Sequence, residues 1–118
     1  MKIWTLDSFL EYIHQQEFVL TFFEGKNCNV CHALFPKLEV LAQTEFPEIP
    51  LIVVNTDENP DIAGQNIVFT LPLIIIFKQG REVVRISGKQ PMFQITEEVR
   101  RTLQFNDSEH PFSAFSVE

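Results

Sequence analysis

The two cysteines of the chain, Cys28 and Cys31, stand three positions apart. An apolar, β-favouring run at 18–23 leads to them through a short polar turn at 24–27, and a helical pattern follows. A Cys-x-x-Cys pair at a strand-to-helix junction of an α/β chain is typical of a redox-active dithiol. Only a thiolate attacks a disulfide, and the unpaired N–H groups of a helix N-terminus favour negative charge. We therefore expect the pKa of the Cys28 thiol to be lowered, with Cys31 one turn later on the same helix face.

Two other chemistries use closely spaced cysteines, and the sequence disfavours both. A zinc site needs about four ligands, but there is no second cysteine pair, and His14 and His110 are predicted to lie in a surface helix and in a tail. The run from Cys28 to His32 also spells the c-type haem attachment string, but it lies inside a βαβ pattern that leaves no haem pocket. We therefore expect neither a bound metal nor a cofactor.

Size, composition and charge narrow the class of protein. The chain has 118 residues, of which 45% are hydrophobic, so one domain can bury a core without a disulfide or a metal. A formal net charge of −7 disfavours a protein that binds nucleic acid or an anionic membrane, since either needs a basic face. The N-terminus lacks the pattern of a signal peptide, and the longest apolar run, 71–77, is too short to span a bilayer. We therefore expect a cytoplasmic protein, in which close cysteines are catalytic or metal-binding rather than structural.

Apolar spacing and turn residues predict the elements that position the cysteines. Helices are expected at 6–13, from 27 or 28 to 44, at 60–65 and from 91 to 103, and strands are expected at 18–23, 51–54, 73–77 and 82–86. Thr5 and Asn27 are the predicted N-caps of the first two helices, and Pro36 is expected to bend the second. The strand at 51–54 is predicted to be buried on both faces, and the strand at 82–86 to lie at an edge.

This order of elements predicts an α/β fold with a mixed sheet. The first two strands are joined by a helix and should be parallel with a right-handed crossover, whereas the later hairpin is antiparallel. Helices should then cover both faces of the sheet. The pattern stops after residue 105, so we expect one domain at 1–105 and a tail at 106–118.

The chain resembles the thioredoxin family in the order and spacing of several features. These features are the strand before Cys28 and Cys31, Pro36, the loop at 55–60, the segment at 70–80 with its proline, strand and Lys-x-Gly turn, and Gly88. The resemblance covers about residues 3–105. It implies a thioredoxin-like fold, with a central mixed sheet of four strands, or five, and helices on both faces.

The resemblance also implies roles for matching positions. Cys28 would be the nucleophile and Cys31 the resolving thiol of a thiol–disulfide oxidoreductase. Pro72 would follow a cis peptide bond, and Leu71 would offer backbone groups to an extended substrate. The partners would be proteins or small molecules that contain a disulfide, together with an electron donor of the thioredoxin-reductase type.

Three positions around the cysteines depart from the family pattern. Thioredoxins usually have Trp where this chain has Asn27, and Gly-Pro where it has Asn29 and Val30. Asn29 and Val30 are also candidates for substrate binding, because they lie between the cysteines. An alternative function therefore stays open, in which the chain is a thioredoxin-fold binding or assembly module whose cysteines undergo no redox turnover.

The groups that would move protons at the site are a further departure. The family usually carries a buried Asp in the strand before the cysteines, and Thr21 is expected near that place. Glu24 is the nearby carboxylate that could exchange a proton with Cys31 in its stead. Lys26 and a protonated His32 are candidates for supporting the Cys28 thiolate.

Overall fold

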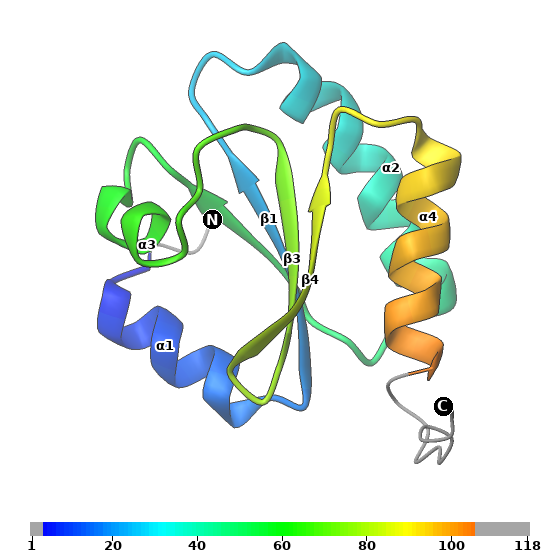
Figure 1. Ribbon diagram of the computed structural model, residues 1–118, viewed down its shortest axis with the longest axis horizontal. Coiled ribbons are helices and arrows are strands. Elements are labelled where there is room, and N and C mark those ends of the chain that lie inside the picture. Colours follow the sequence, from blue (N-terminus) through cyan, green and yellow to red (C-terminus); the bar gives the residue numbers. More distant parts are fainter. Residues whose placement is uncertain (1–3, 106–118) are drawn as a thin grey trace.

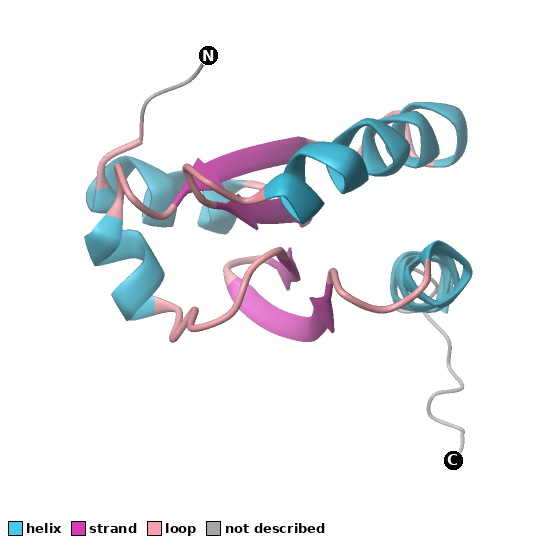
Figure 2. Ribbon diagram, turned by 90° about the horizontal axis from the view of Figure 1, so that it is seen from above, coloured by secondary structure: helices cyan, strands magenta, loops and turns pink. Residues whose placement is uncertain are grey.

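The computed structural model describes residues 4–105, so the predicted tail at 106–118 lies outside the described residues. The helices are α1 (Leu6–Gln15), α2 (Asn29–Glu45), α3 (Pro60–Gln65) and α4 (Met92–Arg100), which continues into a π-helical turn (Arg101–Phe105). The strands are β1 (Phe18–Glu24), β2 (Leu51–Asn55), β3 (Leu73–Lys78) and β4 (Arg81–Ser87). The sheet order is β2-β1-β3-β4, with β2 parallel to β1 and the other neighbours antiparallel (Figures 1 and 2). The predicted mixed α/β sheet is therefore confirmed, with four strands among the described residues.

Strand β1 joins the two apolar layers of the molecule. Helices α1 and α3 cover one face of the sheet, and α2 and α4 cover the other (Figure 1). Successive side chains of a strand point to opposite faces, so Leu20 and Phe22 enter the layer under α2 while Val19 and Phe23 enter the layer under α1. All four side chains are completely buried. β1 therefore contributes buried side chains to both apolar layers.

Local signals in the sequence are confirmed where they involve close neighbours in the chain. Thr5 caps α1, because its hydroxyl accepts a hydrogen bond from the Ser8 N–H at 3.0 Å and the Ser8 hydroxyl bonds back to the Thr5 N–H. The β3–β4 hairpin turns through Gln79 and Gly80, with φ angles of 51° and 85°. Positive φ at both central residues is typical of the two-residue turns that join twisted strands. Helix α2 runs through Pro36 without ending there.

The prediction that 51–54 is buried on both faces is wrong. Among the described residues β2 is an outer strand of the sheet, and only Val54 in it is fully buried. An apolar run alone does not distinguish a central strand from an edge strand, because the distinction depends on which strand pairs with which.

The expected place of Thr21 is also wrong. Thr21 lies between Leu20 and Phe22 in β1 and pairs with Ile75, whose side chain belongs to the layer under α1 and α3. Cys31 lies in the other layer, together with Phe22. Phe22, not Thr21, therefore faces the cysteine helix, and the threonine hydroxyl is fully buried with no hydrogen-bond partner among the described residues.

Replacing Thr21 by valine should stabilise the protein, because a buried hydroxyl without a partner has lost its hydration and gained nothing in return. We expect Thr21→Val to raise the free energy of unfolding by about 1–2 kcal/mol, measured by urea denaturation followed by circular dichroism. The control is Thr56→Val, which removes a hydroxyl that donates to the Glu24 carbonyl at 3.1 Å and should lower the stability. A loss of stability in Thr21→Val would contradict this assignment.

Candidate active site

The cysteine pair lies at the junction of β1 and α2, and Cys28 itself caps the helix. Its Sγ accepts a hydrogen bond from the Cys31 N–H at 3.1 Å. The prediction of Asn27 as the cap is therefore wrong, since the sulfur already occupies the place of a capping oxygen. Sequence reasoning missed this role because cysteine is not a usual capping residue. The cap gives the sulfur a direct donor from the first turn of the helix.

Cys28 and Cys31 form a disulfide, with their Cα atoms 5.2 Å apart. This separation lies within the range that disulfides span. The two sulfur positions differ in access: Cys31 is completely buried in the layer under α2, whereas Cys28 is only partly buried. A reagent in solvent can therefore meet Cys28 first.

The turn before β3 lies at the same end of the sheet as the cysteines. Phe23 near the end of β1 pairs with Leu73 at the start of antiparallel β3, so the residues after one strand meet the residues before the other. The Leu71–Pro72 peptide bond is cis, as the family resemblance implies. The Pro72 carbonyl accepts a hydrogen bond from the Gly88 N–H at 2.9 Å, which ties this turn to the loop after β4.

Gly25 is the point where three loops of the site meet. A Cβ atom at this position would lie 2.7 Å from Leu71 Cδ1 and 3.6 Å from the Asp57 carboxylate, so a side chain would fit only if Leu71 moved. The next residue, Lys26, donates its backbone N–H to Asp57 Oδ2 at 2.6 Å. The turn that carries Cys28 is therefore held against both neighbouring loops.

Asp57 is a site residue that sequence reasoning missed. It lies in a loop that follows β2, and the Asn55 side chain fixes this loop by accepting the N–H groups of Asp57 and Glu58 at 2.9 and 3.1 Å. The signal in the sequence was the polar run after the predicted strand. Strands β1 and β2 are parallel, so the loops that follow them lie at the same end of the sheet.

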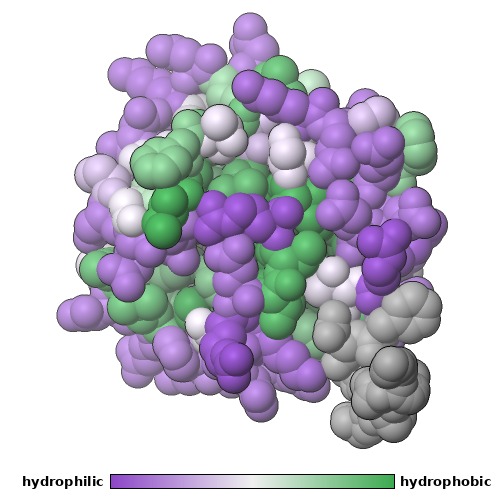
Figure 3. All heavy atoms as spheres, in the orientation of Figure 1, coloured by the Kyte–Doolittle hydropathy of each residue, from purple (hydrophilic) through white to green (hydrophobic). Residues whose placement is uncertain are grey.

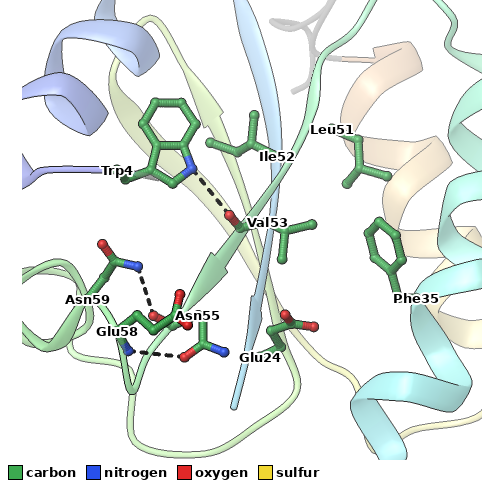
Figure 4. A pocket seen from close by; sticks show the side chains of 9 residues that line it. All are labelled: Trp4, Glu24, Phe35, Leu51, Ile52, Val53, Asn55, Glu58 and Asn59. Carbon is green, nitrogen blue, oxygen red and sulfur yellow. Dashed lines mark hydrogen bonds between the residues drawn. The ribbon is translucent and has the colours of Figure 1, made fainter. Parts of the chain in front are cut away.

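The predicted supporting residues lie at different depths around the cysteines. Glu24 is partly buried and extends into a cavity of about 430 Å³ between β2 and α2, with Phe35 and Val53 on its wall (Figure 4). Lys26 is exposed, and its contact with Asp57 is made by the backbone. His32 on the first turn of α2 is also exposed.

The residues between the cysteines are open to solvent. Asn29 and Val30 are both exposed, with 48% of Val30 accessible. Beside Val30 lies a pocket of about 300 Å³ between α2 and the loop after β4, with Leu34 and Gly88 in its lining. The structure thus places Val30 at a hollowed surface next to the cysteines, whereas Asn29 is exposed but does not line this pocket.

Comparison with known proteins identifies the family. The family model described as Thioredoxin matches residues 1–101. The thioredoxin-like protein YdfQ of Bacillus subtilis is 30% identical over 105 residues, which make up 89% of this chain and 93% of the relative. The chain belongs to the thioredoxin family. A thioredoxin of Alicyclobacillus acidocaldarius is 31% identical over 97 residues, which cover 82% of this chain and 92% of that protein.

Solved thioredoxin structures share the fold. The thioredoxin of Fasciola hepatica matches with a TM-score of 0.74 and 28% identity, over 82% of this chain and 93% of that chain. The thioredoxin of Trypanosoma brucei brucei matches with a TM-score of 0.77 over 88% and 90%, and at 21% identity this match speaks for the fold alone. Family membership and the Cys28–Cys31 disulfide together identify the chain as a thiol–disulfide oxidoreductase.

Residues 4–105 lack two further features. No helix in this part of the chain is long and apolar enough to cross a membrane. No three His, Cys, Asp or Glu side chains in the same range come together in a way that could hold a metal ion.

Adding a methyl group at Gly88 should disturb the proline turn of the thioredoxin site. A Cβ there would lie 2.7 Å from Pro72 Cγ and 2.8 Å from Leu34 Cδ2, so we expect Gly88→Ala to lower the free energy of unfolding by about 1–3 kcal/mol. The matched control is Gly64→Ala in α3, where nothing lies within 4 Å of the added atom. That change should raise stability by about 0.5–1 kcal/mol, because alanine favours a helix. Equal effects in urea denaturation would refute the packing at Gly88.

Proposed function

We propose that Cys28 is the attacking thiolate and that Cys31 resolves the mixed disulfide. In the first step, Cys28 Sγ bonds to one sulfur of the substrate disulfide, the substrate S–S bond breaks, and the other sulfur leaves as a thiolate. In the second step, the Cys31 thiolate attacks Cys28 Sγ, and the second substrate sulfur leaves. The substrate is reduced by two electrons to two thiols, and the protein is left with the Cys28–Cys31 disulfide.

One observation carries this assignment of roles. Cys28 is only partly buried and its Sγ accepts the Cys31 N–H, while Cys31 is completely buried. A donor N–H and the positive end of the helix dipole both favour a negative charge on Cys28. The apolar surroundings of Cys31 disfavour its charged form. This difference supports Cys28 as the thiolate that meets the substrate.

Proton transfer at Cys31 needs a titratable partner, and the residue of β1 that lies beneath α2 does not supply one. Phe22 faces α2 from β1 and has no titratable group. Glu24 is two residues farther along the same strand and therefore on the same face, which supports it as the proton acceptor. Lys26 is the candidate for supporting the Cys28 thiolate, since it lies two residues before it in the turn.

The proposed substrates are proteins or small molecules that contain a disulfide. Leu71 and Pro72 would hold the backbone of an extended substrate, with Asn29 and Val30 on the other side of the cysteines. Each turnover leaves the protein oxidised, so an electron donor of the thioredoxin-reductase type must return two electrons to it. The proposed setting is the cytoplasm, because a reducing compartment keeps such a dithiol in its active form, and the proposed functional unit is the domain at 1–105.

Trapping of the mixed disulfide tests the proposal. Cys31→Ser retains the attacking thiol and removes the resolving one, so it should accumulate a covalent adduct with insulin that dithiothreitol releases. Cys28→Ser is the control and should form no adduct, because its remaining thiol is buried. The readout is a non-reducing gel followed by mass mapping of the linked cysteine.

A module that only binds partners predicts a different outcome. In that case Cys31→Ser forms no adduct, or both variants form the same small amount. Either result would overturn the assignment of Cys28 as the nucleophile.

A further inference from the structure

The loop between α3 and β3 exposes apolar side chains to solvent. Phe69 is 88% exposed, the highest value among the large apolar side chains whose burial the structure describes, residues 4–104, and Ile67 is 59% exposed. Figure 3 shows apolar side chains gathered over this loop on the face of the molecule seen in Figure 1. A single exposed apolar side chain is common on protein surfaces, so the geometry of the loop around Phe69 decides whether it marks an interaction site.

The backbone of this loop is strained. Ile67 has a φ angle of 54°, in the left-handed region. A β-branched residue rarely adopts that conformation, because its side chain crowds the backbone. Such a residue persists only when its surroundings hold it, and residues of this kind cluster at functional sites.

Arg85 and Glu82 of β4 hold the strained segment, and we call this pair the clamp. Arg85 donates one N–H to the Ile67 carbonyl at 2.8 Å and another to the Asn66 carbonyl at 2.7 Å. Glu82 fixes the orientation of the guanidinium through two hydrogen bonds, each of 2.9 Å. These hydrogen bonds to Glu82 also raise the pKa of Arg85, which therefore stays charged. The loop is thus anchored, and its apolar side chains are presented outward from a fixed backbone.

The exposed phenylalanine lies at the cysteine end of the molecule. Phe69 is two residues before Leu71, so the two Cα atoms are at most about 7 Å apart. Leu71 Cδ1 in turn lies 2.7 Å from the place of a Cβ on Gly25, in the turn that carries Cys28. Leu71 therefore links the loop of Ile67 and Phe69 to the turn that carries Cys28.

We propose that Phe69 is a specificity-determining residue that docks an apolar side chain of a protein substrate, next to the disulfide of that substrate. The inference rests on the proposed function, because it extends the substrate surface along the same loop beyond Leu71. A substrate with an apolar residue beside its half-cystine covers Phe69 while its sulfur meets Cys28. Glutathione disulfide carries no apolar side chain beside its disulfide, so it makes no such contact with Phe69. The preferred substrates are thus proteins with apolar residues flanking the disulfide.

The test compares a protein disulfide with a small one. Phe69→Ser should raise the KM for insulin and lower kcat/KM by about tenfold, because a largely exposed phenylalanine no longer becomes buried on binding. The rate with glutathione disulfide should stay within about twofold of that of the unmodified protein. The control is Val40→Ser, which removes another exposed apolar side chain, 59% accessible, from the far half of α2 and should change neither reaction.

A second variant tests the clamp. Arg85→Gln should raise the KM for insulin about threefold without affecting glutathione disulfide, since the loop is released while Phe69 is kept. Unchanged insulin kinetics in Phe69→Ser, or equal losses with both disulfides, would overturn the inference. It would also be overturned if size-exclusion chromatography showed a dimer that Phe69→Ser dissociates, because a second copy would then be the occupant. If the unmodified protein reduces neither disulfide, the proposed function itself fails.

Discussion

The burial of β1 on both faces is the constraint on which the site depends. A shift of one residue would exchange the two sets of side chains between the layers, so the apolar pattern of this strand fixes its register strongly. That register places Phe23 opposite Leu73 and Phe22 under α2. The turn that carries the cysteines follows β1, so it lies at the same end of the sheet as the turn at Pro72.

The chemistry of the pair follows from this placement and from the helix that begins there. Cys28 caps α2 and receives an N–H from Cys31, while the ring of Phe22 lies beneath α2, with its centroid 5.3 Å from that of Phe35. The apolar side chains around Cys31 favour its neutral thiol, and the N–H that Cys28 receives favours its thiolate. The disulfide exchange needs this difference, since one sulfur must attack as a thiolate while the other stays a neutral thiol until the mixed disulfide has formed.

Sequence alone could predict what depends on near neighbours or on a spacing, such as the Thr5 cap, the hairpin at Gly80 and the cysteine pair. The family resemblance added the cis bond before Pro72. Features that depend on which strands pair were out of reach. The edge position of β2, the face of Thr21, and the hold of Asp57 on the turn before Cys28 each involve residues far apart in the chain.

The pH dependence of alkylation tests most directly whether the fold separates the two sulfurs. The reduced protein is treated with limiting iodoacetamide across a range of pH, and the labelled cysteine is identified by mass spectrometry. Labelling should occur at Cys28, with an apparent pKa below the value of about 8.5 for a free cysteine, while Cys31 stays unmodified. Labelling of Cys28 and Cys31 at equal rates, with an ordinary thiol pKa, would contradict the account.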